Sequence, residues 1–448
     1  MHKDILEVNS TYAEQIADDP LDHAAEMHVP AGSFSNPVNP PAIDSDGVLV
    51  AGSHFLMNMC ASNSMTLTNV AFVRDSVKEL FTDAMTFLEA KTRKVLLDAG
   101  SEATDTARGL MADFAAWKNQ FCGVDTQHKL NKYMERNHML ANPLVLEAGK
   151  RWDLKHKSVL SGSHEQVEIP DTFCYIPIED SLRLVLQHQQ SIDLIMSGAN
   201  SAGTDGLYVD WADGKNGKQH RKYFDEHHGQ TEAIPIFIQV YYDDVETTNP
   251  LGSKAGNHKI GAFYFVIKNF HPAVNSALHN IHLLALTHAT DLKSHGFEPV
   301  LDAMVSDFMK LEEQGLTVEL HGTKYLFKCF LSQIVGDNLG VHALFGYMQN
   351  FSKAHHACDL CMCSQGGMQT FFRETQLRTP ALYDEQAKQL KNGQISRSDC
   401  GINKPCTSFQ ALKYYHPASN DSSDIMHDLL EGVIPLEVKL LIHYLVCK

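Results

Sequence analysis

Aspartates follow two apolar runs of this sequence. Asp243 and Asp244 come directly after the run from Ala233 to Tyr242, and Asp337 ends a second run that begins at Tyr325. Carboxylates at the ends of adjacent strands can share a hard cation, because Mg²⁺ prefers oxygen ligands and keeps several waters. Two such ions stabilise the attacking and leaving oxygens of phosphoryl transfer. The alternative is that these aspartates end strands because they favour turns.

A cysteine pair follows Asp337 by 21 residues: Cys358 and Cys361, with Cys363 beside them. The C-x₂-C spacing brings two thiolates onto one tetrahedral cation and is typical of structural zinc. The alternative is a pair of buried cysteines among ordinary surface histidines. The candidates for the remaining ligands are His355, His356, Cys400, Cys406, His416 and His427.

Asp424 and His427 stand at the start of an apolar stretch that predicts a helix, Asp424–Val446. They lie one helical turn apart on one face, and Glu431 lies one further turn from His427. Asp424 also suits a helix N-cap, so this pair has a purely structural explanation as well.

The elements expected to position these residues alternate between strands and helices. Three strands are predicted within Ile234–Asp244, His258–Phe270 and Asn280–Ala289, and a fourth within Tyr325–Asp337. An amphipathic helix over Asp291–Gln314, stopped by Gly315, separates the third strand from the fourth, and a helix over Asn338–Asn350 follows. This order predicts an α/β fold with a mixed sheet flanked by helices.

Five regions are expected along the chain. Residues 1–50 hold one basic residue, Lys3, against nine acidic ones and predict a disordered acidic leader. Residues 51–140 predict a mainly helical region, and residues 141–232 a mixed α/β connecting region. Within the latter, Glu179–Met196 predicts a helix and Ser197–Gln230 mostly loop. Residues 233–365 form the predicted core, and residues 366–448 the start of an incomplete helical insertion.

Composition excludes several classes of protein. The 448 residues carry a net charge of −17 and are 44% hydrophobic and 20% charged, which excludes a collagen-like, coiled-coil or wholly disordered chain. No apolar run is long enough to span a bilayer, so no membrane partner is expected. Ten cysteines spread over the chain indicate a reducing compartment, nucleus or cytosol. The acidity argues mildly against an extensive phosphate-binding surface.

Four short blocks, in this order, resemble the catalytic region of CACTA (En/Spm-like) DDD/E DNA transposases. The similarity extends from Ile234 to about Leu445. The blocks are YYDDVETTNPLGSK, IVGDNLG, HHACDLC and SSDIMHDLLEG.

The resemblance implies an RNase H-like core and a role for several residues. Asp243 or Asp244 would be the first ligand of Mg²⁺ or Mn²⁺, with Asp243 favoured, and Asp337 would be the second. Cys358 and Cys361 would form half of a structural zinc site, and His427, the histidine of the Asp-x-x-His motif, is a tentative further zinc ligand. The family's third acidic residue lies well beyond that motif, so we expect it beyond Lys448; Glu431 is the one substitute within the chain.

The resulting expectation is a transposon-derived nuclear protein that binds DNA. Metal-dependent strand cleavage and transfer would be impaired, because the active site lacks its third acid. A homo-oligomer is compatible with this expectation. The alternative is a domesticated, non-catalytic nucleic-acid or chromatin binding protein stabilised by zinc, and a third option is an acidic interaction scaffold that keeps only the fold.

Overall fold

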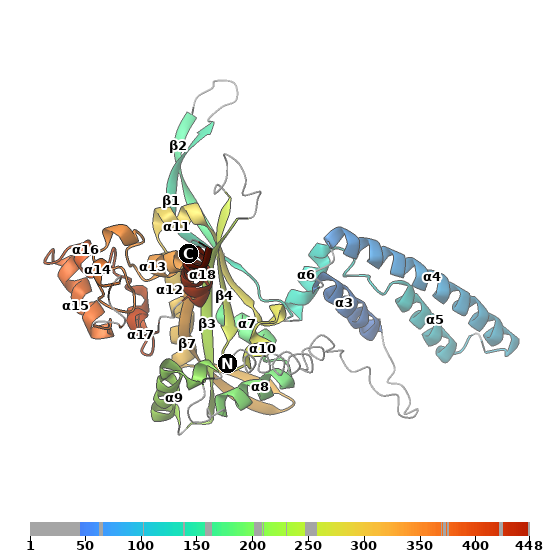
Figure 1. Ribbon diagram of the computed structural model, residues 1–448. Helices are drawn as coiled ribbons and strands as arrows, with labels where there is room; N and C mark the ends of the chain where they lie inside the picture. Colours follow the sequence, from blue (N-terminus) through green and yellow to red (C-terminus); the bar gives the residue numbers. More distant parts are fainter. Residues whose placement is uncertain are drawn as a thin grey trace. The chain divides into compact units, whose positions relative to one another are not determined.

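The protein is described by a computed structural model, whose chain divides into two compact units, Met1–Tyr133 and Met134–Lys448 (Figure 1). The mixed α/β class predicted from the sequence is confirmed. The predicted leader lies outside the described residues up to position 44. The described residues are 45–61, 66–101, 103–137, 139–156, 164–200, 208, 210–229, 231–246, 258–368, 370, 373, 376–420 and 424–446.

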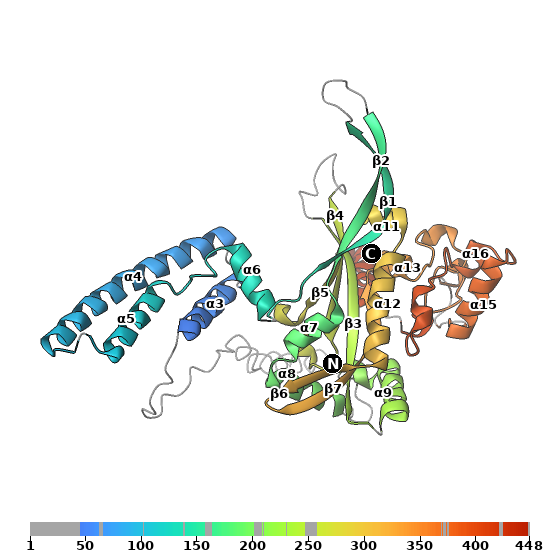
Figure 2. The ribbon, with the colours of Figure 1, turned by 180° about the vertical axis from the view of Figure 1, so that it is seen from behind.

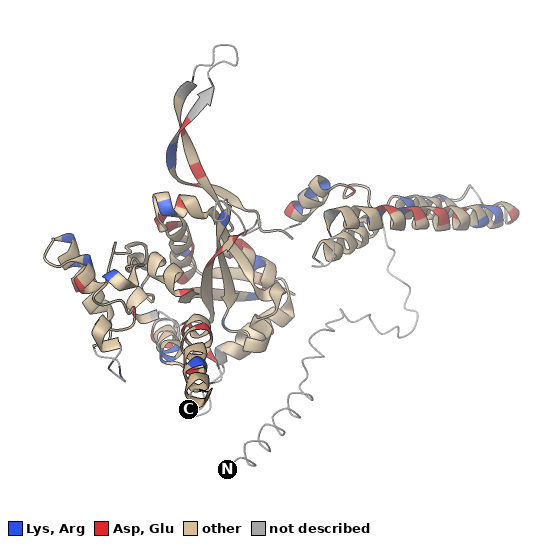
Figure 3. Cartoon of the chain, turned by 45° about the horizontal axis from the view of Figure 1, so that its top comes forward, with Lys and Arg blue, Asp and Glu red and all other residues tan. Residues whose placement is uncertain are grey.

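The first unit is helical where it is described. Its elements are α3 (Ser45–Ala61), α4 (Leu67–Asp98), α5 (Asp105–Lys118) and the start of α6 (Gln127–Arg136). Thr66 and Thr104 cap α4 and α5, because each threonine side chain accepts a hydrogen bond from a main-chain N–H of the first turn. Both basic and acidic side chains occur along α4 (Figure 3). Helix α3 begins at Ser45, so the last six residues of the predicted leader are helical.

The second unit is built on one seven-stranded sheet, in the order β1-β2-β5-β4-β3-β7-β6 (Figures 1 and 2). Among the described strands, β3 and β7 form the parallel pair and the other neighbours are antiparallel. The strands are β1 (Leu144–His156), β2 (His164–Tyr175), β3 (Ala233–Glu246), β4 (Lys259–Ile267), β5 (His282–His288), β6 (Leu316–Leu320) and β7 (Thr323–Gly336).

Apolar residues on both faces of the central strands form the core of this unit. β7 buries six consecutive residues from Phe327 to Ser332, as expected for a strand covered on both faces. Helix α12 (Glu298–Glu313) lies across one face of the sheet (Figure 2). It buries the predicted stripe, which consists of Val300, Leu301, Met304, Phe308 and Leu311.

Shorter helices surround the sheet, and several of them follow β7 in the chain. The α-helices are α7 (Ile178–Val185), α8 (Gln189–Asn200), α9 (Lys215–His228), α10 (Pro272–Asn275), α11 (Ala289–His295), α13 (Asn338–Leu344), α14 (Gln365–Met368), α15 (Pro380–Lys391), α16 (Arg397–Cys400), α17 (Pro417–Asn420) and α18 (Ile434–Val446), and a π-helix, η5 (Met426–Val433), leads into α18. The 3₁₀ turns are η1 (Trp211–Asp213), η2 (Leu278–Asn280), η3 (Phe351–Lys353) and η4 (Ser408–Ala411).

Three predicted helices are shorter than expected. The one over Glu179–Met196 is broken between α7 and α8, and the one over Asp291–Gln314 is broken at Gly296, whose φ of +83° ends α11. The helix predicted over Asn338–Asn350 ends at Leu344, two residues before Gly346 with φ +76°. Glycine adopts this left-handed conformation at no steric cost, and it interrupts a helix.

Several elements were not predicted individually, among them β1, β2, α9 and β6. Helix α9 occupies part of the expected loop Ser197–Gln230, where Gly217, His220 and Phe224 are its buried positions. Their spacing is helical, but two of the three are weakly apolar, so the pattern is faint. Strand β6 is a five-residue edge strand with only Leu316 buried, which is too short for a period-2 pattern to be recognised.

Candidate functional site

The parallel pair β3–β7 brings the predicted aspartates to the same edge of the sheet. In the register of the two strands Tyr242 lies opposite Gly336. Asp243 and Asp337 are the next residues along these two neighbouring strands. Residues alternate between the two faces of a strand. Asp243 therefore projects to the same face as Tyr241, and Asp244 to the same face as Tyr242.

The two candidates for the first aspartate differ in their partners. The Tyr242 hydroxyl donates a hydrogen bond to Asp244 Oδ1 at 2.7 Å, and Tyr242 is buried. Burial, and then the hydrogen bond to Asp244, raise the pKa of the Tyr242 phenol. The Asp243 carboxylate instead accepts the main-chain N–H of Asp244 at 2.7 Å. Asp244 is thus bonded to a buried tyrosine, and Asp243 lies beside the end of β7.

Asp337 is the N-cap of α13. Its Oδ1 accepts the main-chain N–H of Gly340 at 2.5 Å. A Cβ on Gly340 would come within 2.7 Å of that same oxygen and 3.0 Å of the Tyr242 ring, so glycine permits the close approach. The turn from β7 into α13 therefore fixes this carboxylate at the end of the parallel pair. The N-cap role and the expected metal role are compatible, because a carboxylate has two oxygens.

The Asp-x-x-His motif lies beside these aspartates. The His427 Nδ1 bonds to the Asp424 carboxylate, and the main-chain N–H of His427 donates to Asp424 Oδ1 at 3.1 Å. Asn338, next to Asp337 in the chain, donates from Nδ2 to Asp428 Oδ1 at 2.7 Å and so connects α13 with η5. The hydrogen bond to Asp424 raises the pKa of His427, and Glu431 and Asp337 raise it further.

Tyr241 lies near three of these carboxylates, those of Asp243, Asp337 and Asp424, which we call the aspartate cluster. Burial raises the pKa of its phenol, and the charges of Asp243, Asp337 and Asp424 raise it further, in that order. These three carboxylates therefore lie around one tyrosine, although two of them are 181 positions apart in the chain, from Asp243 to Asp424. Asp424 is 12% exposed, whereas Glu431 is 63% exposed and lies 4.0 Å from His427 Nε2.

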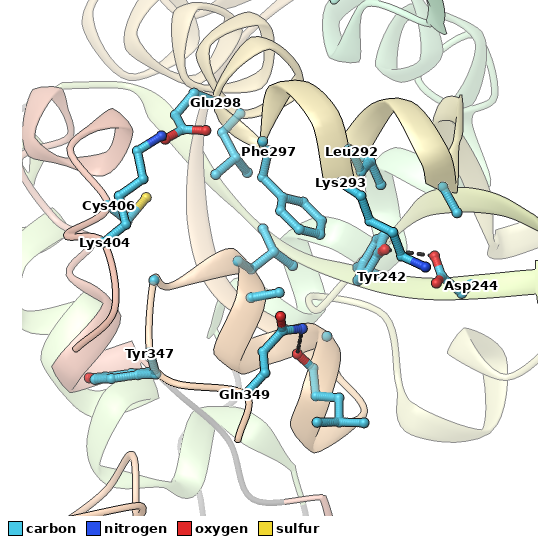
Figure 4. A pocket seen from close by; sticks show the side chains of 18 of the residues that line it. Tyr242, Asp244, Leu292, Lys293, Phe297, Glu298, Tyr347, Gln349, Lys404 and Cys406 are labelled. Atoms are coloured by element: carbon cyan, nitrogen blue, oxygen red, sulfur yellow. Dashed lines mark hydrogen bonds and ion pairs between the residues drawn. The ribbon is translucent and has the colours of Figure 1, made fainter. Parts of the chain in front are cut away.

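A cavity of about 660 Å³ opens at this edge of the sheet (Figure 4). Its wall contains Asp243, Asp244 and Asp337 together with residues of α11, α12 and α13. The charged and amide side chains that complete the lining are Lys259, Lys293, His295, Glu298, Gln349, Asn403 and Lys404.

The cysteine pair lies in the loop after α13. Cys358 Sγ and Cys361 Sγ are 3.6 Å apart. Two ligands of one tetrahedral zinc with Zn–S bonds of about 2.3 Å are separated by about 3.8 Å, so the pair has the spacing that a shared ion needs. Burial raises the pKa of the Cys358 thiol to about 12, which disfavours a free thiolate without a cation.

The other predicted zinc ligands have different surroundings. Cys400 Sγ contacts main-chain carbonyls, and Cys406 lines the cavity at the aspartates. His416 packs against Tyr383 and lies 3.4 Å from Asp384. His427 belongs to the aspartate cluster. His355 and His356 pack their rings against each other, and His356 Nδ1 is buried without a partner among the described residues.

Tyr241 and Arg378 are among the residues of these sites that were not predicted from the sequence. Tyr241 was included only in a strand, although an aromatic residue two positions before a candidate aspartate shares its face. Arg378 is buried and donates from Nε to the carbonyl of Cys358 at 2.8 Å and from Nη2 to that of His356 at 3.2 Å. No local pattern points to Arg378, because its partners lie about 20 residues away.

Within the described part of the chain, no group of three or more His, Cys, Asp or Glu side chains is arranged to hold a metal ion. The two sites thus offer pairs of protein ligands, Asp243 with Asp337 and Cys358 with Cys361. None of the described helices is long and apolar enough to cross a membrane. No family model and no curated protein sequence matches this chain.

Proposed function

We propose that the sheet unit has an RNase H-like fold that binds DNA and a divalent cation at Asp243 and Asp337. The support for the fold is the strand order β5-β4-β3-β7. The antiparallel strands β3, β4 and β5 are followed in the chain by α11, α12 and the edge strand β6, and then by β7, which is parallel to β3. The single observation that carries the site is the register of β3 and β7, which makes these two aspartates neighbours.

Two carboxylates at one strand edge fit a magnesium or manganese site. Mg²⁺ is usually held by one or two carboxylates, with waters and substrate phosphates completing the octahedron. When bound, the ion supplies an activated water and charge stabilisation for attack at a phosphate. Asp243 and Asp337 would hold it, and the Gly340 N–H would orient Asp337 through its other oxygen.

Catalysis in this family of sites would need a third carboxylate near Asp243 and Asp337. Among the described residues, Asp424 is a better substitute than Glu431, because Asp424 is nearly buried and its charge acts on Tyr241 together with those of Asp243 and Asp337. Asp424 is, however, engaged twice by His427. We therefore infer weak or absent strand transfer, with DNA and cation binding retained.

The experiment measures Mn²⁺-dependent nicking of supercoiled DNA by the full chain and by Asp337→Ala. Asp193→Ala is the matched control, since Asp193 is exposed on α8 and contacts only Gln189 among the described residues. Nicking that is lost in Asp337→Ala and kept in the control supports catalysis. Equal nicking by all three proteins would reject a catalytic role for Asp337.

The alternative, a non-catalytic nucleic-acid or chromatin binding protein stabilised by zinc, is favoured by the Cys358–Cys361 spacing. We propose that this pair holds zinc, with the remaining ligands supplied by side chains that move or by water. The full chain should retain about one equivalent of zinc after dialysis, and Cys358→Ser should lose it. Cys122→Ser is the control, because Cys122 is an exposed free cysteine in the other unit. A zinc-free protein of unchanged stability would contradict this proposal.

A further inference from the structure

The cavity at the aspartates also has a cationic wall, formed by Lys259 and Lys293. We propose that these two lysines bind the phosphate backbone of the nucleic acid strand that enters the cavity. The inference rests on the proposed function, because it takes the neighbouring aspartates as the cation site. It adds the residues that would recognise the substrate itself.

The position of the two lysines follows from the order of the strands. Lys259 is the first residue of β4, which pairs with β3 on the side away from β7. Lys293 belongs to α11, which packs on β4 (Figure 4). A nucleic acid strand that crosses this end of the sheet would therefore contact the two lysines on one side of Asp243 and the start of α13 on the other side.

Gly261 brings α11 close to the sheet. A Cβ at this position would lie 2.6 Å from Leu292 Cδ1 and 3.3 Å from the Tyr242 ring, so glycine leaves room for the Leu292 side chain against β4. Leu292 is the residue before Lys293, and it is buried. Lys293 thus follows a residue that packs on β4, and its side chain reaches toward Asp244, as Figure 4 shows.

The other cations of the lining are already engaged. Lys404 forms an ion pair with Glu298, and His295 Nε2 lies 2.9 Å from Asp171 Oδ2. Lys259 and Lys293 have no ion pair with any described residue. An ammonium group without an ion pair among the described residues is suited to a phosphate oxygen, which it contacts as a point charge.

The charge of the lining supports an anionic ligand once a cation is present. With Lys404 and Glu298 cancelling, three carboxylates face two ammonium groups, a formal charge of −1. One divalent ion at the aspartates changes this to +1. The site would then attract a phosphodiester although the whole chain is acidic, because nearby charges in a low-dielectric cleft outweigh distant ones.

The test measures binding of a fluorescein-labelled DNA duplex to the full chain by fluorescence anisotropy, over a series of KCl concentrations. Ca²⁺ fills the cation site. We expect Lys259→Ala/Lys293→Ala to weaken binding about tenfold at low salt. The slope of log K against log salt should fall by about 1.8, since each phosphate contact contributes about 0.9.

The control for charge is Lys388→Ala/Lys391→Ala, which removes two exposed lysines from α15 of the same unit. This control should have the wild-type slope of log K against log salt. Lys259→Arg/Lys293→Arg keeps both charges and should also have the wild-type slope. If the wild-type chain binds DNA and the alanine pair at 259 and 293 has the same slope, the inference is wrong while the proposed function stands. If the wild-type chain does not bind the duplex at low salt, both are wrong.

Discussion

The two aspartates at the end of β3, Asp243 and Asp244, have different partners. Asp244 is bonded to the hydroxyl of the buried Tyr242, so its carboxylate is oriented by the core. Asp243 accepts a main-chain N–H and a hydrogen bond from the Tyr241 hydroxyl, and it lies next to Asp337 across the parallel pair. Because these neighbours differ, substitutions at the two positions should have different consequences.

We expect Asp243→Asn to abolish binding of one Mn²⁺ ion and Asp244→Asn to weaken it less than tenfold. An amide keeps the shape of either side chain but removes the charge that a hard cation requires. Isothermal titration of Mn²⁺ into the metal-free full chain measures both. Equal losses would show that the two carboxylates share the ion, and a larger loss in Asp244→Asn would reverse the assignment.

On the scale of elements, Arg378 connects the cysteine loop to α15, because its Nη1 donates to Gln386 Oε1 at 3.3 Å. Its guanidinium donates to the carbonyls of Cys358 and His356 and lies 5.2 Å from the centre of the Tyr347 ring. We expect Arg378→Met to lower the free energy of unfolding by roughly 2–4 kcal/mol, because both carbonyls lose charged donors. Urea denaturation measures this. Arg397→Met, at an exposed arginine, should cost well under 1 kcal/mol.

Gly315 ends α12 and begins the turn into β6. Its φ is +75°, and a Cβ would lie 2.6 Å from the carbonyl oxygen of Phe327. We expect Gly315→Ala to destabilise the sheet unit by about 1–3 kcal/mol, through the left-handed backbone and the clash with β7. Gly366→Ala is the matched control, since nothing surrounds a Cβ there. A thermal denaturation midpoint unchanged in Gly315→Ala would contradict this reading of the turn.

Elements with a strong period could be predicted from the sequence, and those defined by distant contacts could not. The four central strands carry long apolar, β-branched runs, and the α12 stripe has a clear helical spacing, so their positions follow from local pattern. Helix α9 depends on His220 and Phe224 packing against β3 and β7, which no local pattern shows.

The aspartates show the same limit at the site. Their strand-end positions were predictable, but the choice of Asp243 over Asp244 depends on the register with β7. The place of the Asp-x-x-His motif depends on a contact between Asn338 and Asp428, 90 residues apart. Histidine is a common zinc ligand, so the sequence predicts His427 as a partner of the cysteines, whereas His427 bonds to Asp424 in the structure.

For the whole molecule, the buried ionisable groups set how stability depends on pH. Burial lowers the pKa of His220 and of His282 to about 4, and it raises the pKa of Glu312 to about 8. Between about pH 4 and 6.5 the unfolded chain binds more protons at the two histidines, so acid lowers stability there. Between about pH 4.5 and 8 the folded chain keeps the proton on Glu312, so alkali lowers stability.

These opposing effects predict maximal stability of the sheet unit near pH 6.5. Each group changes the free energy of unfolding by at most about 1.4 kcal/mol per pH unit. Two histidines outweigh Glu312 below pH 6.5, and Glu312 acts alone of the three above it, where the raised pKa of His427 adds to the decline. Urea denaturation at a series of pH values, followed by circular dichroism, measures the profile.

Glu312→Gln separates the two limbs of this profile. The amide cannot ionise, so the variant should lose most of the decline between pH 6.5 and 8 and keep the acid limb. Because the effect of Glu312 accumulates from about pH 4.5, the variant should exceed the wild type at pH 8 by roughly 4 kcal/mol. Glu313→Gln, next in the chain but with an exposed side chain, makes the same change of charge without this effect. A wild-type stability that keeps rising to pH 8 would show that the Glu312 carboxylate finds a cation or water, and Lys413, which already lowers its pKa, is the nearest candidate.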